Sequence, residues 1–430
     1  MVLHLDTLLR KAAVAGLAGA ATLGLSLPLW SQFHAARLSA QGTHESLQAA
    51  VHVQPRNAEM QNRLGRLRLY SPLGDAAHTL AALQRAVELD PRNGAFWMDL
   101  ALAREIQGDI EGAATAIRRA RAAEPRTPSL LWHEANFDIR RGNLQHALGL
   151  LRELMRNAPE YTGRVLPLFS RVTEPATLLR DVVPDTRPAM EAAVEFIRRE
   201  NHLSAATVTW DRLLTMKDPP TGQVRQFLDW LIARGEADLA VRVWQGAADR
   251  GWIPIDPDAA RQPLYNGDMR HPLEDFGFDW RVLPHAEASV WIEGRGPEPG
   301  MNSLCVQFNP EARTHYANIV HYVAVQPNYH YSLRAAMRSD RLAARAGAFL
   351  LISDPSRPGF AVRTDAITGS GSWRDVLAAI ETGPASRMLA IRLTRPAPVA
   401  AEEPGSGLVC IARLAWSELG PMKTGAAGAQ

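Results

Sequence analysis

The feature that most constrains this chain is an internal repeat with a period of about 34 residues. Four prolines, Pro55, Pro91, Pro125 and Pro159, divide its first third into units of 36, 34 and 34 residues. In the second unit, an apolar segment, FWMDLALAREI, precedes a glycine-containing turn and an alanine-rich segment. Repeats of this length are typical of helix pairs that stack side by side, so the chain is expected to begin as a helical array.

The residue types within the repeat suit two helices that pack closely. Ala101, Ala113 and Ala120 are small enough to let the helices approach, Gly108 lies in the turn, and Pro125 ends the second helix. This arrangement resembles the tetratricopeptide repeat, at whose motif positions the chain has Trp97, Leu100, Ala101, Gly108, Ala113, Ala120 and Pro125. The motif is specific for the fold and unspecific for the ligand.

The resemblance covers residues 44–250, with three firm repeats and two degenerate ones. After Pro159 the register is interrupted by about 25 additional residues, and it returns at Asn201 and Gly235, which are 34 residues apart. The interruption contains several prolines and is expected to form short helices that cap or bend the array.

The resemblance implies an interaction scaffold that binds peptides or partner proteins and does no chemistry. It places the partner in the groove formed by the first helix of each repeat. The matching positions are Asn62, Arg66, Met98, Leu102, Glu105, Trp132, Asn136 and Arg140. Their mixed chemistry suits a peptide backbone or a carboxylate beside an apolar anchor side chain. The alternative is that they are solvent-facing positions of a spacer.

A segment without charges, residues 12–30, is long enough to cross a bilayer as a helix. Arg10 and Lys11 precede it, which predicts a cytoplasmic amino terminus and an exported remainder of the chain. A cleaved secretory signal is the competing interpretation. The apolar run is longer than usual for such a signal, and the candidate cleavage sites, His34-Ala35-Ala36 and Leu38-Ser39-Ala40, match the expected small residues poorly.

From about Leu264 the apolar pattern changes from helical to alternating. Eight short segments rich in branched and aromatic residues, separated by turn residues, predict an antiparallel β-sandwich or jelly roll. The two cysteines, Cys305 and Cys410, both lie here, and each alternates with apolar neighbours along its strand. An isolated pair in an oxidising compartment predicts one disulfide, and two separate thiols are the alternative.

The β region resembles jelly-roll carbohydrate-binding modules and related galactose-binding-like domains. The resemblance rests on the opening YNGDMRHPLEDFGFDWRV, the hairpin VAVQPNYHYSLRAAMR, the segment GSGSWRDV and the closing VCIARLAWSEL. Ala412, Arg413 and Leu414 stand where such modules often carry acids for a structural calcium, so that metal is not expected. Stacking on sugar rings would require exposed aromatics. The candidates are Trp280, Trp291, Trp373 and Trp416, and the alternative for each is a place in the core.

The sequence contains few motifs typical of catalytic or metal-binding sites. The sequence has no nucleophile elbow, phosphate-binding loop, zinc-protease or Cys-x-x-Cys motif. Three histidines, His315, His321 and His330, are expected to be structural or on the surface, although three on one sheet could bind a metal. Glu274, Asp275 and Asp279 could supply a glycosidase pair, but they are more simply the entry to a strand. We expect no enzyme, no catalytic residue, no metal and no cofactor.

The predicted architecture is a multidomain α-then-β chain: a cytoplasmic amino terminus (1–11), a transmembrane anchor (12–30), a tetratricopeptide-like helical repeat domain (31–250), a linker (251–263), a β-sandwich (264–418) and a disordered tail (419–430). A net charge of +2 gives no reason to expect nucleic acid. The predicted location is the bacterial inner membrane, with one span and most of the chain in the periplasm. The predicted role is a scaffold for partner proteins, by analogy of architecture an accessory of exopolysaccharide or O-antigen assembly or export. The alternatives are a glycan-binding envelope protein and a glycosidase.

Overall fold

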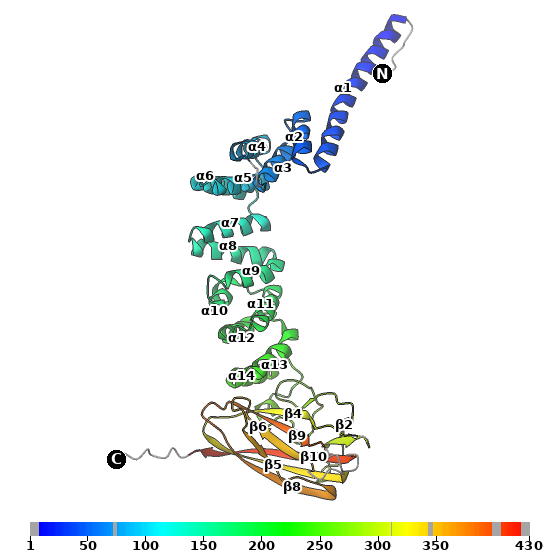
Figure 1. The fold of residues 1–430 in the computed structure, drawn as a ribbon, viewed down its shortest axis with the longest axis vertical. Helices are drawn as coiled ribbons and strands as arrows, with labels where there is room; N and C mark the ends of the chain where they lie inside the picture. Colours follow the sequence, from blue (N-terminus) through cyan, green and yellow to red (C-terminus); the bar gives the residue numbers. More distant parts are fainter. Residues whose placement is uncertain (1–7, 72–74, 311, 343–346, 398–405, 423–430) are drawn as a thin grey trace, which may run out of the picture. The chain divides into compact units, whose positions relative to one another are not determined.

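The computed structural model describes residues 8–71, 75–310, 312–342, 347–397 and 406–422 (Figure 1). The chain divides into two compact units, the first formed by residues 1–171 and 181–184 and the second by residues 172–180 and 185–430. The first unit is helical, and the second combines helices with two β-sheets.

A long helix and a series of helix pairs build the first unit. Its helices are α1 (Leu8–Ala40), α2 (His44–Val53), α3 (Ala58–Leu69), α4 (Ala76–Leu89), α5 (Gly94–Ile106), α6 (Ile110–Ala123), α7 (Pro128–Arg140), α8 (Leu144–Asn157) and α9 (Thr162–Phe169). The helices α2, α4, α6 and α8 each end two residues before one of the four periodic prolines. Because proline disfavours a helical residue before it, the period sets these ends. The prediction of helical repeats is confirmed.

The repeat positions take the packing roles that their chemistry predicts. Leu100 and Ala101 on α5 and Ala113 on α6 are buried in one apolar cluster between the helices. Gly108, in the turn that joins α5 to α6, has a φ of 79°, a left-handed conformation that side chains disfavour. Trp97 is half-buried, and its indole N–H donates to the carbonyl of Pro91 at 2.9 Å. The side chain at the first motif position therefore connects its helix to the preceding turn.

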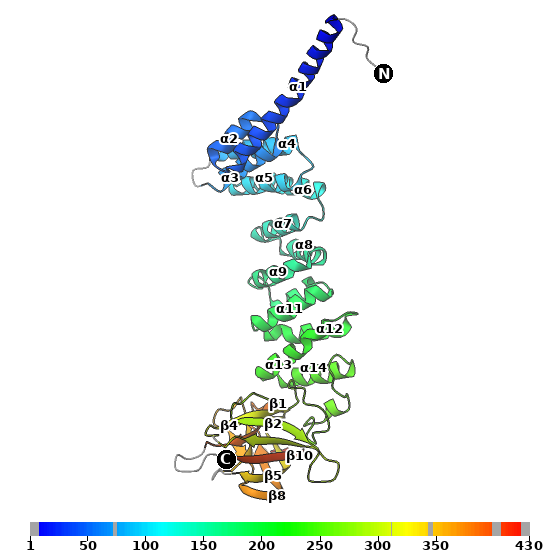
Figure 2. The same cartoon turned by 90° about the vertical axis from the view of Figure 1, so that its right-hand side faces the viewer.

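Helix α1 is continuous from the apolar segment into the repeats. Its first half projects away from the other helices of the unit (Figures 1 and 2). Its second half packs on α2 and α3, where Ala35 is fully buried and the guanidinium of Arg63 donates to Ser39 Oγ at 2.8 Å. The segment Val14–Ala40 of this helix is long and apolar enough to cross a membrane, a test that a signal sequence also passes. Residues 1–7 of the predicted cytoplasmic segment lie outside the described residues.

The helices of the second unit begin inside the interruption of the repeat. These are α10 (Pro175–Thr177), α11 (Arg187–Arg199), α12 (Ala206–Thr215), α13 (Val224–Ala233) and α14 (Ala237–Asp249). Asn201 and Gly235, the two predicted turn residues, both have positive φ, at 58° and 76°. The short helices α9 and α10 occupy the interruption, as expected from its prolines.

The described strands form two five-stranded antiparallel sheets. One has the order β1 (Arg281–Val282), β4 (Tyr316–Ala324), β9 (Met388–Arg395), β6 (Phe349–Ser353) and β7 (Ala361–Arg363). The other has the order β2 (Ala288–Glu293), β3 (Ser303–Phe308), β10 (Gly407–Pro421), β5 (Tyr329–Leu342) and β8 (Gly369–Glu381). Apolar residues of both sheets share one buried cluster, so the expected β-sandwich is present (Figure 1).

The segment expected to link the two domains belongs to the second unit, because residues 251–263 carry buried side chains such as Ile253 and Ile255. On α13, the carboxylate of Asp229 accepts from Gly277 N at 2.8 Å and from Arg281 at 2.6 Å. These bonds join the last helices to the sandwich. Residues 419–421, expected in a tail, belong to strand β10, and residues 423–430 lie outside the described residues.

Candidate functional site

A recess of 160 Å³ lies between the first helices of three successive repeats, α3, α5 and α7. Five of the eight predicted groove residues line it: Arg66, Met98, Leu102, Glu105 and Arg140. The other lining residues are Tyr70, Asp99, Ala101, Ile117, His133 and Phe137. Residues that are distant in the sequence therefore meet because equivalent turns of stacked helices lie side by side.

Of the three residues predicted on α7, only Arg140 lines the recess, where His133 and Phe137 join it. His133, Phe137 and Arg140 are spaced i, i+4 and i+7 and share one side of the helix. Trp132 is directed toward the following helices, with its ring 6.1 Å from that of Phe169, and the Asn136 amide donates to the carbonyl of Trp132 at 2.7 Å. The imidazole of His133 and the phenyl ring of Phe137 therefore line the recess in place of the predicted Trp132 and Asn136, each one residue earlier. Their helical spacing was visible in the sequence and could have identified them.

Asp99 and Asn62 form the most buried polar pair beside the recess. Asn62 is buried, and its amide donates to Asp99 Oδ2 at 2.8 Å, while its own Oδ1 has no hydrogen-bond partner among the described residues. Burial raises the pKa of Asp99, opposed by the hydrogen bond from Asn62 and by the charge of Arg66. Arg66 lies 3.8 Å from Asp99 Oδ1 and is 56% exposed. The guanidinium of Arg66 thus retains donors that face solvent.

Glu105 and Arg140 form a bidentate ion pair that connects two repeats. The guanidinium of Arg140 donates through Nε and Nη2 to the two oxygens of Glu105, at 2.7 and 2.8 Å. Nearby, burial lowers the pKa of His133, which favours the neutral imidazole. Met98 is buried, Leu102 is half-buried, and with Phe137 they form the apolar floor. The recess therefore combines an apolar floor with charged groups at its edge, a composition suited to binding a peptide segment.

The four candidate tryptophans of the sandwich divide equally between the core and the outer surface. Trp280 is fully buried and donates to the carbonyl of Asn266 at 3.1 Å, and Trp416 stacks on the buried ring of Tyr331. Trp291 is 38% exposed on β2, and Trp373 is half-exposed on β8. Trp291 and Trp373 are therefore the two that remain available to a ligand.

These two rings lie at opposite ends of one row of side chains across the outer sheet face. The register aligns Trp291 with Cys305, Cys305 with Cys410, and Cys410 with Arg338. The guanidinium of Arg338 lies over the ring of Trp373, 5.5 Å from its centre. Four strand intervals separate the two tryptophans, which corresponds to roughly 19 Å.

Cys305 and Cys410 occupy directly paired positions on β3 and β10 and are joined in the structure by a bond of 2.08 Å between their sulfur atoms. Both are fully buried, although they lie on the side of the sheet opposite its apolar face. Glu293 and Arg338, which contact each other, lie in the same region of this face. Glu293 and the two sulfurs are close enough to share a metal, but the sulfurs are bonded to each other.

Among the described residues, the three histidines and three acids considered as catalytic or metal-binding candidates do not form one cluster. His321 is fully buried with Nε2 2.9 Å from the carbonyl of Tyr265, whereas His330 is half-exposed beside Glu381 and His315 is exposed. Among the acids, Glu274 pairs with Arg225 and Asp275 accepts from Val282 N at 2.9 Å. Their contacts hold the loop that precedes the sandwich.

Asp279 is the most perturbed of these acids. It is fully buried and accepts hydrogen bonds from Glu274 N at 2.5 Å and from the Asn266 amide at 3.3 Å. Burial raises its pKa to about 6 despite these bonds. Its hydrogen bonds fix the loop that precedes the sandwich.

No protein-family model matches the chain, and no curated protein sequence matches it. Solved structures align with parts of it. The enzymatically active domain of tailspike protein 4 of bacteriophage CBA120 has 9% identity and a TM-score of 0.28, and the alignment covers 37% of this chain and 22% of that one. A CBM4 structure has 12% identity and a TM-score of 0.26 over 36% of this chain and 99% of that one. Pseudomonas aeruginosa PilF has 16% identity and a TM-score of 0.26 over 45% and 91%. At these scores the alignments identify no activity.

Proposed function

We propose that this protein is a membrane-anchored, non-enzymatic scaffold that binds a segment of a partner protein in the recess between α3, α5 and α7. The observation that carries the proposal is the recess itself, to which three successive repeats contribute both apolar and charged side chains. A stacked array in which equivalent positions face one recess suits an extended segment better than a small metabolite.

The charges indicate what the segment would present. Arg140 is held by a bidentate pair, whereas Arg66 makes one long contact to Asp99 and is more than half exposed. A carboxylate of the partner can therefore be bound by Arg66 without displacing a well-made ion pair. The floor around Met98 and Leu102 would take an adjacent apolar side chain.

The continuity of α1 supports an uncleaved anchor. Both candidate cleavage sites lie within this helix, and residues of both, Ala35 and Ser39, are buried against the repeats. Both sites also match poorly the small residues that signal cleavage requires. The anchored protein would lie in a bacterial inner membrane with its repeats and sandwich in the periplasm.

Site-specific photo-crosslinking in living cells tests the recess. A photoreactive phenylalanine replacing Leu102 should crosslink to a partner protein, and the adduct should be lost when Arg66 is changed to alanine. The same amino acid at Arg119, exposed on α6, is the matched control and should give no adduct. Identical adduct patterns at the two positions, or none at Leu102, would show that the repeats are a spacer.

The outer face of the sandwich supports a second candidate function, binding of a polysaccharide. The observation in its favour is the row that ends in Trp291 and Trp373, because exposed rings can stack on sugars. Affinity electrophoresis in gels containing envelope polysaccharide should retard the parent protein, and changing both tryptophans to alanine should abolish the retardation. Leu377→Ala, which removes an exposed apolar side chain of β8, is the control. Equal mobility of all three proteins would exclude this role.

We further propose that the partner belongs to the machinery of exopolysaccharide or O-antigen assembly or export. This rests on the combination of an anchor, a repeat array and a sandwich with exposed tryptophans. The identity of the protein crosslinked at Leu102 tests it directly, since a partner from an unrelated process would contradict the assignment while leaving the scaffold role intact.

A further inference from the structure

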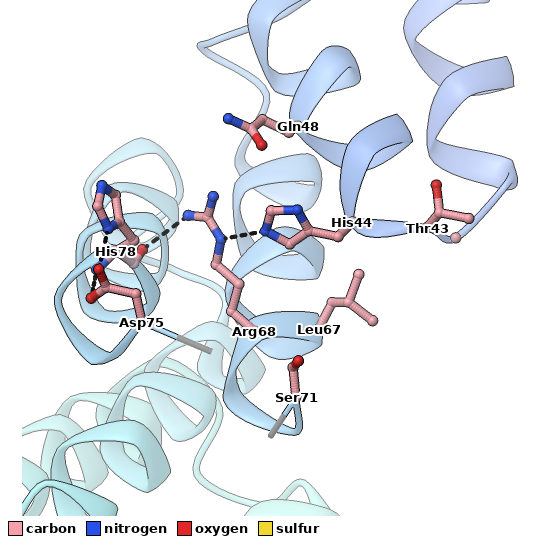
Figure 3. Close-up of a pocket in the computed structure, with 9 residues that line it drawn as sticks. Thr43, His44, Gln48, Leu67, Arg68, Ser71, Asp75 and His78 are labelled. Atoms are coloured by element: carbon pink, nitrogen blue, oxygen red, sulfur yellow. Dashed lines mark hydrogen bonds and ion pairs between the residues drawn. The ribbon is translucent and has the colours of Figure 1, made fainter. Parts of the chain in front are cut away.

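A second and larger cavity lies at the amino-terminal end of the repeats, away from the recess. Its volume is 590 Å³, and its walls come from the start of α2, the end of α3 and the start of α4. The polar side chains around it include Thr43, His44, Gln48, Arg68, Asp75 and His78 (Figure 3). Cavities of about 300 to 1,000 Å³ are the size that small-molecule ligands occupy.

Arg68 lies at the centre of this cavity in a fixed orientation. Its Nε donates to His44 Nε2 at 3.0 Å, and its Nη1 donates to the carbonyl of His78 at 3.4 Å. Figure 3 shows the guanidinium of Arg68 between the imidazoles of His44 and His78. Since His44 accepts this bond, its proton is on Nδ1. Arg68 Nη2 has no hydrogen-bond partner within the part of the chain that the structure describes.

Asp75, the one acid among the described residues that line the cavity, already accepts hydrogen bonds from its own helix. Asp75 accepts from Ala77 N at 2.8 Å and from His78 N at 3.3 Å through Oδ1, and from His78 Nδ1 at 2.8 Å through Oδ2. Of the remaining groups, the Arg68 fork and His44 Nδ1–H are donors, and the Gln48 amide can donate through its nitrogen as well as accept through its oxygen. The surplus of donors around a fixed, planar cation is complementary to an oxyanion.

We propose that this cavity is a binding site for a small anionic molecule that carries a phosphate or carboxylate group, bound through the free edge of the Arg68 guanidinium and the Gln48 amide. The backbone N–H groups at the start of α2 and α4 are capped by Thr43 and Asp75, so recognition comes from side chains. The site is distinct from the recess and does not depend on the proposed partner. Bound there, an anion would connect α2, α3 and α4 and stabilise the end of the array nearest to α1.

Calorimetric titration of the full chain in detergent, with inorganic phosphate and with citrate at constant ionic strength, tests the site. At least one probe should bind, and Arg68→Gln should weaken it about tenfold or more, because it removes a charged hydrogen bond. Gln48→Ala should weaken binding a few-fold. Arg119→Gln, which removes an exposed arginine of α6, should leave it unchanged. The probe that binds more tightly identifies the group as phosphate or carboxylate.

Arg68 could instead serve only to connect α2 with α4, and the variants separate the two roles. If neither probe binds the parent, or if Arg68→Gln and Arg119→Gln bind equally well, the proposal is wrong. Circular dichroism of each variant shows whether the repeats remain folded. If Arg68→Gln unfolds the repeats, Gln48→Ala becomes the test, because Gln48 is exposed and its replacement should leave the fold intact. Unchanged anion binding by Gln48→Ala would then contradict the proposed site.

Discussion

Replacing Asp279 with asparagine should change how the stability of the sandwich depends on pH. Asp279 is fully buried, and its pKa rises from 3.8 to about 6 on folding. Between pH 3.8 and about 6, Asp279 is ionised in the unfolded chain but protonated in the folded chain. Stability is therefore greatest below pH 4 and falls as pH rises through 6. This rise in the pKa of Asp279 corresponds to about 3 kcal/mol of stability.

His321 has the opposite effect on the pH dependence of stability, over nearly the same pH interval. Its burial lowers its pKa from 6.5 to about 4, so the unfolded chain gains a proton as pH falls while the folded chain does not. Stability from His321 is thus present above pH 6.5 and lost as pH falls toward 4, again by about 3 kcal/mol. In the parent protein the contributions of Asp279 and His321 should nearly cancel.

Each single variant should reveal the contribution of the other residue. Asp279→Asn should lose about 3 kcal/mol as pH falls from 6.5 to 4, whereas His321→Gln should gain about that much over the same interval. Hydrogen exchange of peptides from β1 and β4, corrected for the intrinsic pH dependence of exchange, measures the local free energy of unfolding. Profiles of both variants that run parallel to the parent would refute the reasoning, since the other titrating groups are common to all three proteins.

Three further predictions concern the disulfide, the repeat and the topology. Denatured without reductant, the protein should show no alkylation of Cys305 or Cys410, and modification of either would contradict the bond. Gly108→Ala should destabilise the first unit by about 1 kcal/mol, because the residue has a positive φ. Gly149→Ala, in the interior of α8 with open space around it, should be neutral or stabilising, and thermal unfolding compares the two. A reporter fused after Gln430 should be active in the periplasm, and cytoplasmic activity would reverse the proposed topology.

Local chemistry along the chain specifies the ends of the repeat helices and the faces of the strands. The proline period placed the ends of α2, α4, α6 and α8, because proline acts on the residues directly before it. The alternation of apolar residues identified the strands, and Cys305 and Cys410 could be assigned to the face of the sheet away from its apolar cluster. Each of these properties repeats over a few residues and is therefore visible without knowledge of what packs nearby.

Which side chains meet across different helices and strands depends on tertiary packing. The face of α7 that lines the recess carries His133 and Phe137 rather than Trp132, because the rotation of that helix is set by its packing on both neighbouring pairs. Likewise Trp280 and Trp291, which look alike in sequence, differ in burial because one lies between the sheets and the other outside them. Such positions depend on contacts between residues far apart in the chain, and the period of a single helix or strand contains no information about them.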